Sequence, residues 1–577
     1  MASPNLLRFR RSLAQWHALE SVERQIRSTD PHLRRKYLRE FTEAYQTYDS
    51  VLTTAEVGAD CHTADVLLIA DYHALPASQH FATELIEQLS ASGRQVVLGL
   101  EFVFARDQHT IDEWVAGEID SNELRERIRF DLDWGYQWEP FYRVLESGRR
   151  QAERVYGLDC LPRNNLRKIS ARDRHAAALI DDIRKRHPEA VVVVLFGESH
   201  LAPTHLPALL RQRRPDDRIL TILQNVDPLY WKAAGEPFER VEAVRVSDEV
   251  VCVFNSTPLE KYESYRLCIE RWKQERTTRP DLAPSFFNMI SALLRFLNID
   301  AYSPTTGTQP GFLVDQLPEV YSQVSPQRIR RLLLNRGAED DEVRAILSRF
   351  HANGTCYVPS LNSVFVREYT LVNGAEEAAR FLHLVARGSM AESENHPAQD
   401  RAAEATEDPP SDGLDRASTS DEDRFYTRVL EEALAYFGSR ALYPGRAPVK
   451  EIDLYGLYSE PREPIDTVGL RSQREYLQMI DFLVLHRDYE TNCRNYRERP
   501  QLLHEGVGWP GARFDFVTQW LGRLLGSQIY DAYVSGRVAK RFIRALFLRN
   551  LDKPGTARTL YFVTIRRLRQ PRRRTLI

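Results

Sequence analysis

Three apolar runs, separated by segments with a helical pattern, most constrain how this chain can fold. They occupy residues 65–70, 95–100 and 190–196. Short apolar runs that alternate with amphipathic segments, such as 78–89, indicate buried strands joined by helices. Units of this kind form a parallel sheet with helices on both faces. The sequence therefore predicts an α/β fold with an N-terminal parallel sheet, followed by mostly helical α+β middle and C-terminal domains.

Polar residues follow the end of each apolar run. They are Asp71, Tyr72 and His73 after the first, Glu101 after the second, and Glu198 and His200 after the third. The crevice beyond the carboxyl ends of parallel strands is where ligands usually bind. An ionisable group that ends an apolar strand also needs solvent or a partner. We therefore expect His73, Glu101 and His200 to share a ligand-binding site, with Glu198 and Asp71 as further members.

Several further motifs accompany these strand ends in order. They are Gln79-His80, Gly99-Leu100-Glu101-Phe102, Arg106-Asp107-Gln108, the segment 132–138 with its two tryptophans, Tyr142, the segment 158–168, and Gly197-Glu198-Ser199-His200-Leu201. In order, spacing and residue type, residues 60–225 resemble the ChaN family of haem-binding proteins. That family lies in a superfamily with the TIKI and TraB/PrgY proteins and the erythromycin esterases. One departure is that Ala70-Asp71 stands where the family usually has Gly-Glu.

The resemblance implies a haem- or iron-binding protein with its ligand at the strand ends. Haem needs an apolar slot, an axial ligand and cations for its propionates. On this interpretation Tyr72 and His73 supply axial atoms, and Arg106 or Arg163 holds the propionates. The slot would be lined by aromatic side chains, namely Phe102, Phe104, Trp134, Tyr136 and Trp138.

Two alternatives use the same positions. A divalent metal ion bound by His73, Glu101 and His200 could activate water to hydrolyse an ester or amide. Without a metal, His73 or His200 could act as general base, with Glu101 and Glu198 completing the catalytic group. The other alternative is a non-enzymatic scaffold that has lost the family ligand, which the altered first motif keeps open. Whether the chain is an enzyme is left undecided.

The 577 residues suffice for several cores, and the pattern predicts five segments. They are an N-terminal helical extension (1–50), a ChaN-like α/β domain (51–300), a domain with a winged-helix outline (301–387), an acidic disordered linker (388–424) and a basic, mostly helical domain (425–577). The linker lacks aromatic residues and carries excess negative charge, so it cannot bury enough apolar area to offset its ordering entropy. In the last domain, residues 559–563 are predicted as a strand.

Positive charge gathers in the last domain, although the whole chain has a formal charge of -3. Residues 534–549 are predicted to form a basic amphipathic helix, and residues 566–574 are rich in arginine. Such an end could bind an anionic surface, either membrane or nucleic acid. The ordinary alternative is a surface helix with a solvated tail.

The sequence shows neither a signal peptide nor a membrane-spanning run. No apolar run approaches the ~20 residues that span a bilayer, so no transmembrane segment is expected. No signal peptide is visible, and the six cysteines include no C-x-x-C pair, which fits a reducing compartment. We therefore expect a cytoplasmic, multidomain protein, and a homo-oligomer is left open.

Overall fold

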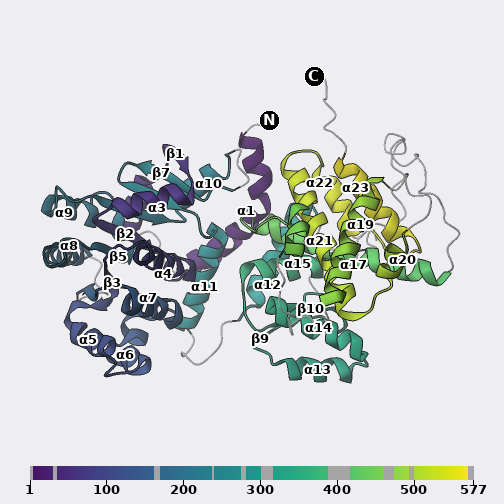
Figure 1. Cartoon of the computed structure of the whole chain (residues 1–577), viewed down its shortest axis with the longest axis horizontal. Helices are drawn as coiled ribbons and strands as arrows, with labels where there is room; N and C mark the ends of the chain where they lie inside the picture. The colour runs from purple at the N-terminus through teal and green to yellow at the C-terminus, as the bar shows by residue number, and fades with distance from the viewer. Residues whose placement is uncertain are drawn as a thin grey trace, which may run out of the picture. The chain divides into compact units, whose positions relative to one another are not determined.

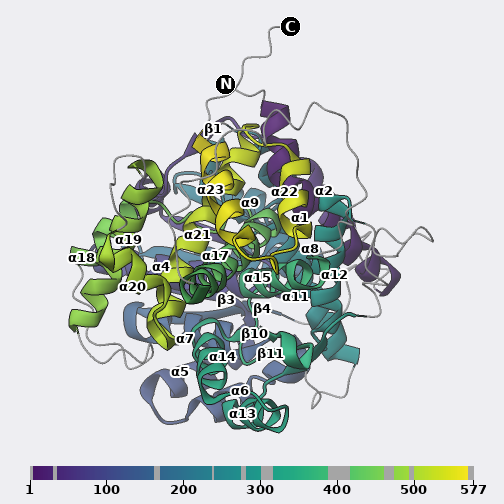
Figure 2. The same cartoon turned by 90° about the vertical axis from the view of Figure 1, so that its right-hand side faces the viewer.

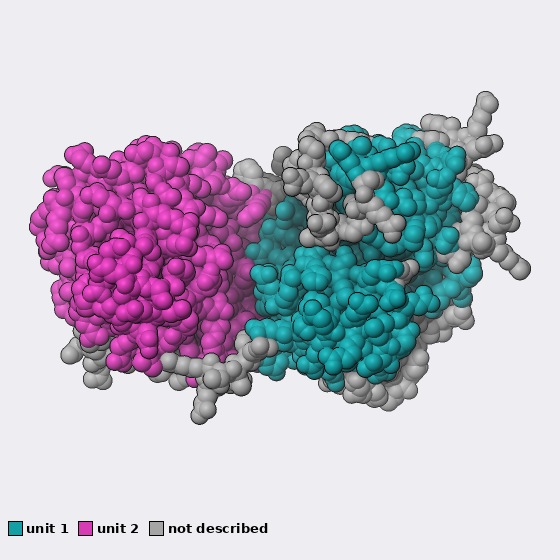
Figure 3. Space-filling model, turned by 60° about the horizontal axis from the view of Figure 1, so that its bottom comes forward, with its two compact units in different colours: residues 1–18, 281–577 teal, residues 19–280 magenta. Residues whose placement is uncertain are grey.

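The structure, a computed structural model, describes most of the chain in two compact units (Figure 1). The described residues are 4–29, 36–160, 169–236, 240–273, 281–299, 316–387, 416–459, 473–492 and 500–569. Unit 1 comprises residues 1–18 and 281–577, and unit 2 comprises residues 19–280 (Figure 3). Each unit has hydrophobic cores of its own.

Unit 2 is built on an eight-stranded sheet with the order β1-β7-β8-β6-β2-β5-β3-β4. The strands are β1 (Ser50–Leu52), β2 (Val66–Asp71), β3 (Val96–Phe104), β4 (Arg154–Asp159), β5 (Val191–Gly197), β6 (Ile219–Gln224), β7 (Ala243–Ser247) and β8 (Val250–Val253). All neighbours from β8 to β4 are parallel. At the other edge β7 is antiparallel to β8 and β1 is antiparallel to β7. The predicted parallel sheet is thus confirmed, with an added antiparallel edge.

Helices cover both faces of this sheet (Figure 1). They are α2 (Lys36–Ala44), α3 (Thr54–Thr63), α4 (Pro76–Ala91), α5 (Gln108–Ala116), α6 (Ser121–Arg127), α7 (Trp138–Gln151), α8 (Ile169–Arg186), α9 (Leu206–Arg213), α10 (Asp227–Ala233) and α11 (Pro258–Lys273). Successive strand residues point to opposite faces. Leu67 and Ile69 of β2 therefore join a core with α4 and α7, whereas Leu68 and Ala70 join a core with α8 and α9. Burial on both faces explains why β2 is apolar from Val66 to Ala70.

Unit 1 is mainly helical. Besides the start of α1 (Pro4–Thr29), it contains α12 (Ala283–Leu297), α13 (Pro326–Asn335), α14 (Asp340–Asn353), α15 (Leu371–Ala386), α17 (Arg416–Leu442), α18 (Ile452–Ser459), α19 (Gln473–Asn492), α20 (Gln501–Val507), α21 (Gly511–Val534), α22 (Lys540–Leu548) and α23 (Thr556–Arg569). The long helix α17 packs against α15, α21 and α23 (Figure 2). Gly526 permits the close approach of α21 to α17, because a Cβ at this position would lie 2.4 Å from the carbonyl oxygen of Ala433 in α17.

A small sheet lies beside α13 and α14. Its strands, β9 (Glu319–Ser322), β10 (Thr355–Val358) and β11 (Ser363–Val366), have the order β10-β11-β9. The helix, helix, strand, strand order predicted for this region is present, and β9 adds a strand parallel to β11. No helix among the described residues is both long and apolar enough to cross a membrane.

Three C-terminal segments differ from their predicted form. The predicted strand at 559–563 lies within α23, whose buried face carries Tyr561 and Leu568. Residues 416–424, assigned to the linker, form the first turns of α17, while 388–415 lie outside the described residues. The predicted single helix at 534–549 is the end of α21, a turn and α22, because Gly536 has a φ of +77°.

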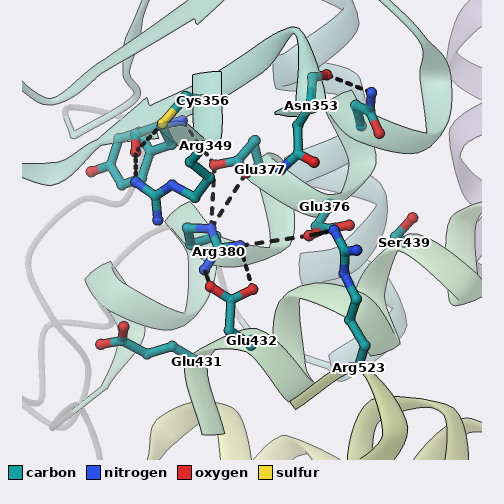
Figure 4. A network of polar contacts seen from close by, with 12 residues as sticks. Arg349, Asn353, Cys356, Glu376, Glu377, Arg380, Glu431, Glu432, Ser439 and Arg523 are labelled. Atoms are coloured by element: carbon teal, nitrogen blue, oxygen red, sulfur yellow. Dashed lines mark hydrogen bonds and ion pairs between the residues drawn. The ribbon is translucent and has the colours of Figure 1, made fainter. Parts of the chain in front are cut away.

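A buried ion network joins α15 to α17 and α21 (Figure 4). Two guanidinium nitrogens of Arg380 donate to the two carboxylate oxygens of Glu432, each at 3.0 Å. The same guanidinium lies 3.3 Å from Glu377 and 3.6 Å from Glu376, which also faces Arg523 at 3.6 Å. Burial alone would raise the pKa of Glu432, but Arg380 holds it well below its ordinary value.

Candidate functional site

The carboxyl ends of β2, β3 and β5 bring the three predicted central residues together. Nε2 of His73 lies 3.9 Å from Oε2 of Glu101, and Nε2 of His200 lies 3.6 Å from Oε1 of the same carboxylate. Glu101 lies within β3, directly after the last residue of β3 that pairs with β5, Leu100. The side chain of His73 is 22% exposed, whereas those of Glu101 and His200 are each 4% exposed. His73 is therefore the member of this group that solvent reaches.

Each histidine is oriented by an aspartate. Nδ1 of His73 donates to Oδ2 of Asp71 at 2.8 Å, and Nδ1 of His200 donates to Oδ1 of Asp173. An ionised carboxylate only accepts, so Nδ1 carries the proton and the neutral ring keeps its lone pair on Nε2. Gln79 also donates to Asp71 and fixes that carboxylate. In the neutral form of each ring the lone pair therefore belongs to the nitrogen nearer Glu101, and protonation of that nitrogen places a positive charge beside the carboxylate.

Arg172 joins Glu101 to a further carboxylate, Asp159. Its guanidinium donates to Oε1 of Glu101 at 2.6 Å and to Oδ1 of Asp159 at 2.7 Å. The N–H of Gly197 donates to Oε2 of Glu101 at 2.5 Å. Burial raises the pKa of Glu101, but Arg172 and the two histidines outweigh it, so this pKa lies below its ordinary value. Glu101 is accordingly a carboxylate with both oxygens engaged.

His73 gains a proton more readily than an ordinary histidine. Burial lowers the pKa of His73, but the carboxylates of Asp71 and Glu101 together raise it by more. The net shift of this pKa is upward. The charged ring is thus stabilised by two carboxylates, one on each side.

Glu198 forms an ion pair beside this group. Nζ of Lys261, on α11, lies 3.2 Å from its Oε2 and 4.6 Å from the ring centroid of Tyr72. Burial raises the pKa of Glu198, and Lys261 opposes that rise. Burial also raises the pKa of Tyr72 well above its ordinary value, so its phenol stays protonated.

Some of the predicted aromatic slot surrounds His73. The His73 ring centroid lies 4.4 Å from that of Trp134 and 5.3 Å from that of Tyr136. The ring centroid of Phe102 lies 6.3 Å from that of Trp134. These three side chains form an aromatic wall beside the accessible histidine.

Other predicted slot residues have different neighbours. Trp138 stacks on Tyr142 at 5.5 Å, and Phe104 lies under the guanidinium of Arg106 at 4.7 Å. The Arg106 side chain is 54% exposed and pairs with Asp107 at 3.6 Å. Arg163 lies outside the described residues.

The predicted divalent metal site has no support in the geometry. Among the described residues, no group of three or more His, Cys, Asp or Glu side chains is arranged to hold a metal ion. The physical reason is Arg172, whose cation lies against Glu101 and would repel a divalent ion there. Each oxygen of Glu101 also already accepts a hydrogen bond, from Arg172 or from the N–H of Gly197.

The sequence-based interpretation missed Arg172, Asp173, Asp159 and Lys261. Asp159 ends β4 as the other candidates end their strands, so the same signal could have identified it. Arg172 and Asp173 lie near the start of α8, and Lys261 lies on α11. Helical charged residues of this kind carry no local signal that separates them from a solvated surface.

A family model matches part of unit 2. Residues 57–187 match the family model described as "Haem-binding uptake, Tiki superfamily, ChaN". The resemblance to ChaN is confirmed over this segment. The match includes β2, β3 and β4 and the residues Tyr72, His73 and Glu101. It stops before β5, His200 and α11.

Two solved structures are similar to parts of the chain. One is the type III effector HopBA1, with 13% identity, a TM-score of 0.28, and coverage of 36% of this chain and 97% of that one. The other is ChaN of Campylobacter jejuni, in a structure of cofacial haem binding, with 14% identity, a TM-score of 0.25, and coverage of 35% and 91%. No curated protein sequence matches the chain.

Proposed function

We propose that unit 2 binds haem at the carboxyl ends of its parallel strands, with His73 as the axial ligand. The observation that carries this proposal is the hydrogen bond from Nδ1 of His73 to Asp71, at 2.8 Å on a partly exposed ring. Histidines that ligate metals typically donate their other ring N–H to a carboxylate, which fixes the tautomer and increases ligand basicity. The ChaN match over 57–187 supports the choice of haem.

Tyr72 is the weaker candidate for the axial position. A tyrosine ligates iron as a phenolate, and burial makes that form unfavourable here because the pKa of Tyr72 is raised well above its ordinary value. Its ring also lies against Lys261. The neighbouring walls, Trp134 and Tyr136, suit a planar macrocycle, since haem sites are apolar and aromatic.

A titration of the full-length chain with haemin tests the assignment. Wild-type protein is expected to give a saturable Soret shift, and His73→Ala is expected to move the Soret band and weaken binding. Tyr72→Phe is the matched control, because it removes only a hydroxyl from the adjacent residue and should leave the band where it is. Binding with an unchanged band in His73→Ala would remove His73 from the coordination sphere.

Metal-free hydrolysis of an ester or amide is a second candidate. It is favoured by the second pair, His200 with Asp173, which is directed at the same carboxylate and has no task in axial ligation. His73 would take the proton of an attacking water, since Asp71 and Glu101 stabilise its charged form. Hydrolysis of p-nitrophenyl esters that is lost in His73→Ala and His200→Ala would support this candidate. A chain that neither binds haem nor hydrolyses esters would leave the scaffold alternative.

A further inference from the structure

Helix α11 lies beyond the segment that matches ChaN, yet one of its faces contributes to the same site. Lys261, Tyr265, Cys268 and Trp272 are spaced four, three and four residues apart, which places them on one side of a helix. The Tyr265 ring centroid lies 6.2 Å from that of Tyr72. This side of α11 therefore faces the end of β2.

Aromatic rings continue along this face to the surface of unit 2. Trp272 is 45% exposed, and its ring centroid lies 6.0 Å from that of Tyr265 and 5.3 Å from that of Tyr136. Tyr136 in turn lies 5.3 Å from His73. An unbroken series of ring contacts thus runs from an exposed indole to the proposed axial ligand.

The indole of Trp272 is held in place by the backbone. Its Nε1–H donates to the carbonyl oxygen of Gly135 at 2.8 Å. Gly135 has a φ of +76°, which L side chains rarely adopt, and a Cβ there would lie 3.4 Å from Nε1 of Trp272. Glycine is therefore suited to this position by its backbone conformation, which presents the carbonyl oxygen to the indole. The indole is thus held in one position while 45% exposed, and it lies against Tyr136, the ring that contacts His73.

We infer that α11 supplies a second wall of the ligand site, in which Trp272 is the outermost ring that a planar conjugated macrocycle packs against. The inference rests on the proposed function for the class of ligand. It adds residues from outside the matched segment, Tyr265 and Trp272, as determinants of affinity. Aromatic pairs prefer edge-to-face or offset packing, and the interplanar angles of 76° and 81° at Trp272 are of the edge-to-face kind.

The wall and the axial ligand differ in their dependence on iron. Packing against Trp272 involves only the macrocycle, whereas His73 acts through the metal. Iron-free protoporphyrin IX therefore probes the wall alone, and haemin probes both. Their affinities can be measured separately on the full-length chain by fluorescence quenching and by the Soret band.

Trp272→Ala is expected to raise the dissociation constants of both porphyrins about tenfold, equivalent to about 1.4 kcal/mol of binding free energy. Trp272→Phe keeps a ring but loses the hydrogen bond to Gly135, so it should give a smaller loss. Trp16→Ala is the matched control, because Trp16 is 46% exposed and belongs to unit 1. It should leave both affinities unchanged. Melting curves of the three variants check that each is folded.

The possible results separate the two proposals. If Trp272→Ala binds both porphyrins with unchanged affinity, the inference that Trp272 packs against the macrocycle is wrong, even where His73→Ala shifts the Soret band. Weakened protoporphyrin binding in Trp272→Ala, with an unaltered haem spectrum in His73→Ala, keeps the wall and overturns the axial assignment. Equal losses in Trp16→Ala and Trp272→Ala would also contradict the inference. A wild-type chain that binds neither porphyrin overturns both proposals.

Discussion

Gly197 determines how closely the central side chains of the site approach one another. A Cβ at this position would lie 3.1 Å from Oε2 of Glu101 and 3.2 Å from Nε2 of His73. Its N–H also donates to Glu101. The φ of Gly197 is -53°, which any residue can adopt, so the glycine is needed for space and not for its backbone conformation.

Gly197→Ala is expected to displace Glu101 and His73 by a few tenths of an ångström. Overpacking of this kind costs about 1–3 kcal/mol of unfolding free energy. Haem binding should weaken and the Soret band should move, because the proposed axial ring changes position. Titration with haemin and a melting curve measure the two effects.

Gly58→Ala provides the comparison for that substitution. Gly58 lies within α3, and a Cβ there meets nothing within 4 Å. Alanine in a helix interior should stabilise the protein by about 0.5–1 kcal/mol and leave haem binding unchanged. Wild-type spectra and stability in Gly197→Ala would mean that the site tolerates a wider separation than its geometry indicates.

Helices α15 and α17 are joined by the charges around Arg380. Arg380→Met would leave Glu376, Glu377 and Glu432 buried without their shared cation. Breaking a buried pair by removing one partner costs about 3–5 kcal/mol. The loss here should lie at the lower end of that range, because Arg428 still lies 2.8 Å from Glu432 and Arg446 still lies 2.6 Å from Glu376. Urea denaturation should show this loss as a lower free energy of unfolding.

An exposed pair gives the reference for the ion network. Arg143 and Glu139 on α7 are 54% and 66% exposed, and exposed pairs of this spacing contribute about 0.3–0.5 kcal/mol. Arg143→Met should therefore change stability little. The double variant Arg380→Met with Glu432→Leu should recover part of the single variant's loss. Equal, small effects of Arg380→Met and Arg143→Met would show that the network contributes nothing to stability.

The central strands were predictable because their signal is local. The runs that became β2, β3 and β5 are apolar up to the residues that end them, since both faces of each strand are buried. Short edge strands gave no such signal, and β1, with three residues, was not predicted. The strand predicted at 559–563 was wrong because its residues also suit a helix, and only packing of Tyr561 within unit 1 decides between the two.

The site was predictable where strand ends define it and not where helices complete it. His73, Glu101 and His200 follow apolar runs, and the structure brings them together. Arg172 and Lys261 come from helices, where a charged residue usually indicates a solvated face. Their burial depends on tertiary partners that lie 71 and 63 positions away in the sequence, so a local pattern cannot reveal it.

The distribution of charge over the molecule bears on the anionic partner predicted from the sequence. The chain has a formal charge of -3, but α22 exposes Arg541, and Arg549 follows its end. The apolar side of α22 is packed within unit 1, where Ile543 and Phe547 are buried. This packing explains the amphipathic pattern. The apolar side is therefore engaged in the fold, and any attraction to an anionic surface would be electrostatic alone.

Binding to vesicles that contain phosphatidylserine tests this hypothesis on the full-length chain. Each arginine near an anionic membrane contributes about 1 kcal/mol, and the attraction decays over a Debye length of about 8 Å at physiological salt. Co-sedimentation should therefore be seen at low salt, fall steeply as salt is added, and be absent with neutral vesicles. Arg541→Gln with Arg549→Gln should weaken it.

The matched control for that pair is Arg143→Gln with Arg150→Gln, which removes two exposed arginines from α7 in unit 2. This control should bind vesicles as wild type does, because its charges lie outside the basic end. A nucleic-acid partner would instead give a log–log salt slope close to the number of phosphates neutralised. Co-sedimentation that persists at high salt would require apolar insertion, and α22 would then have to leave its packed position. An equal loss of co-sedimentation in the two double variants would mean that net charge, and not this end of the chain, governs binding to vesicles.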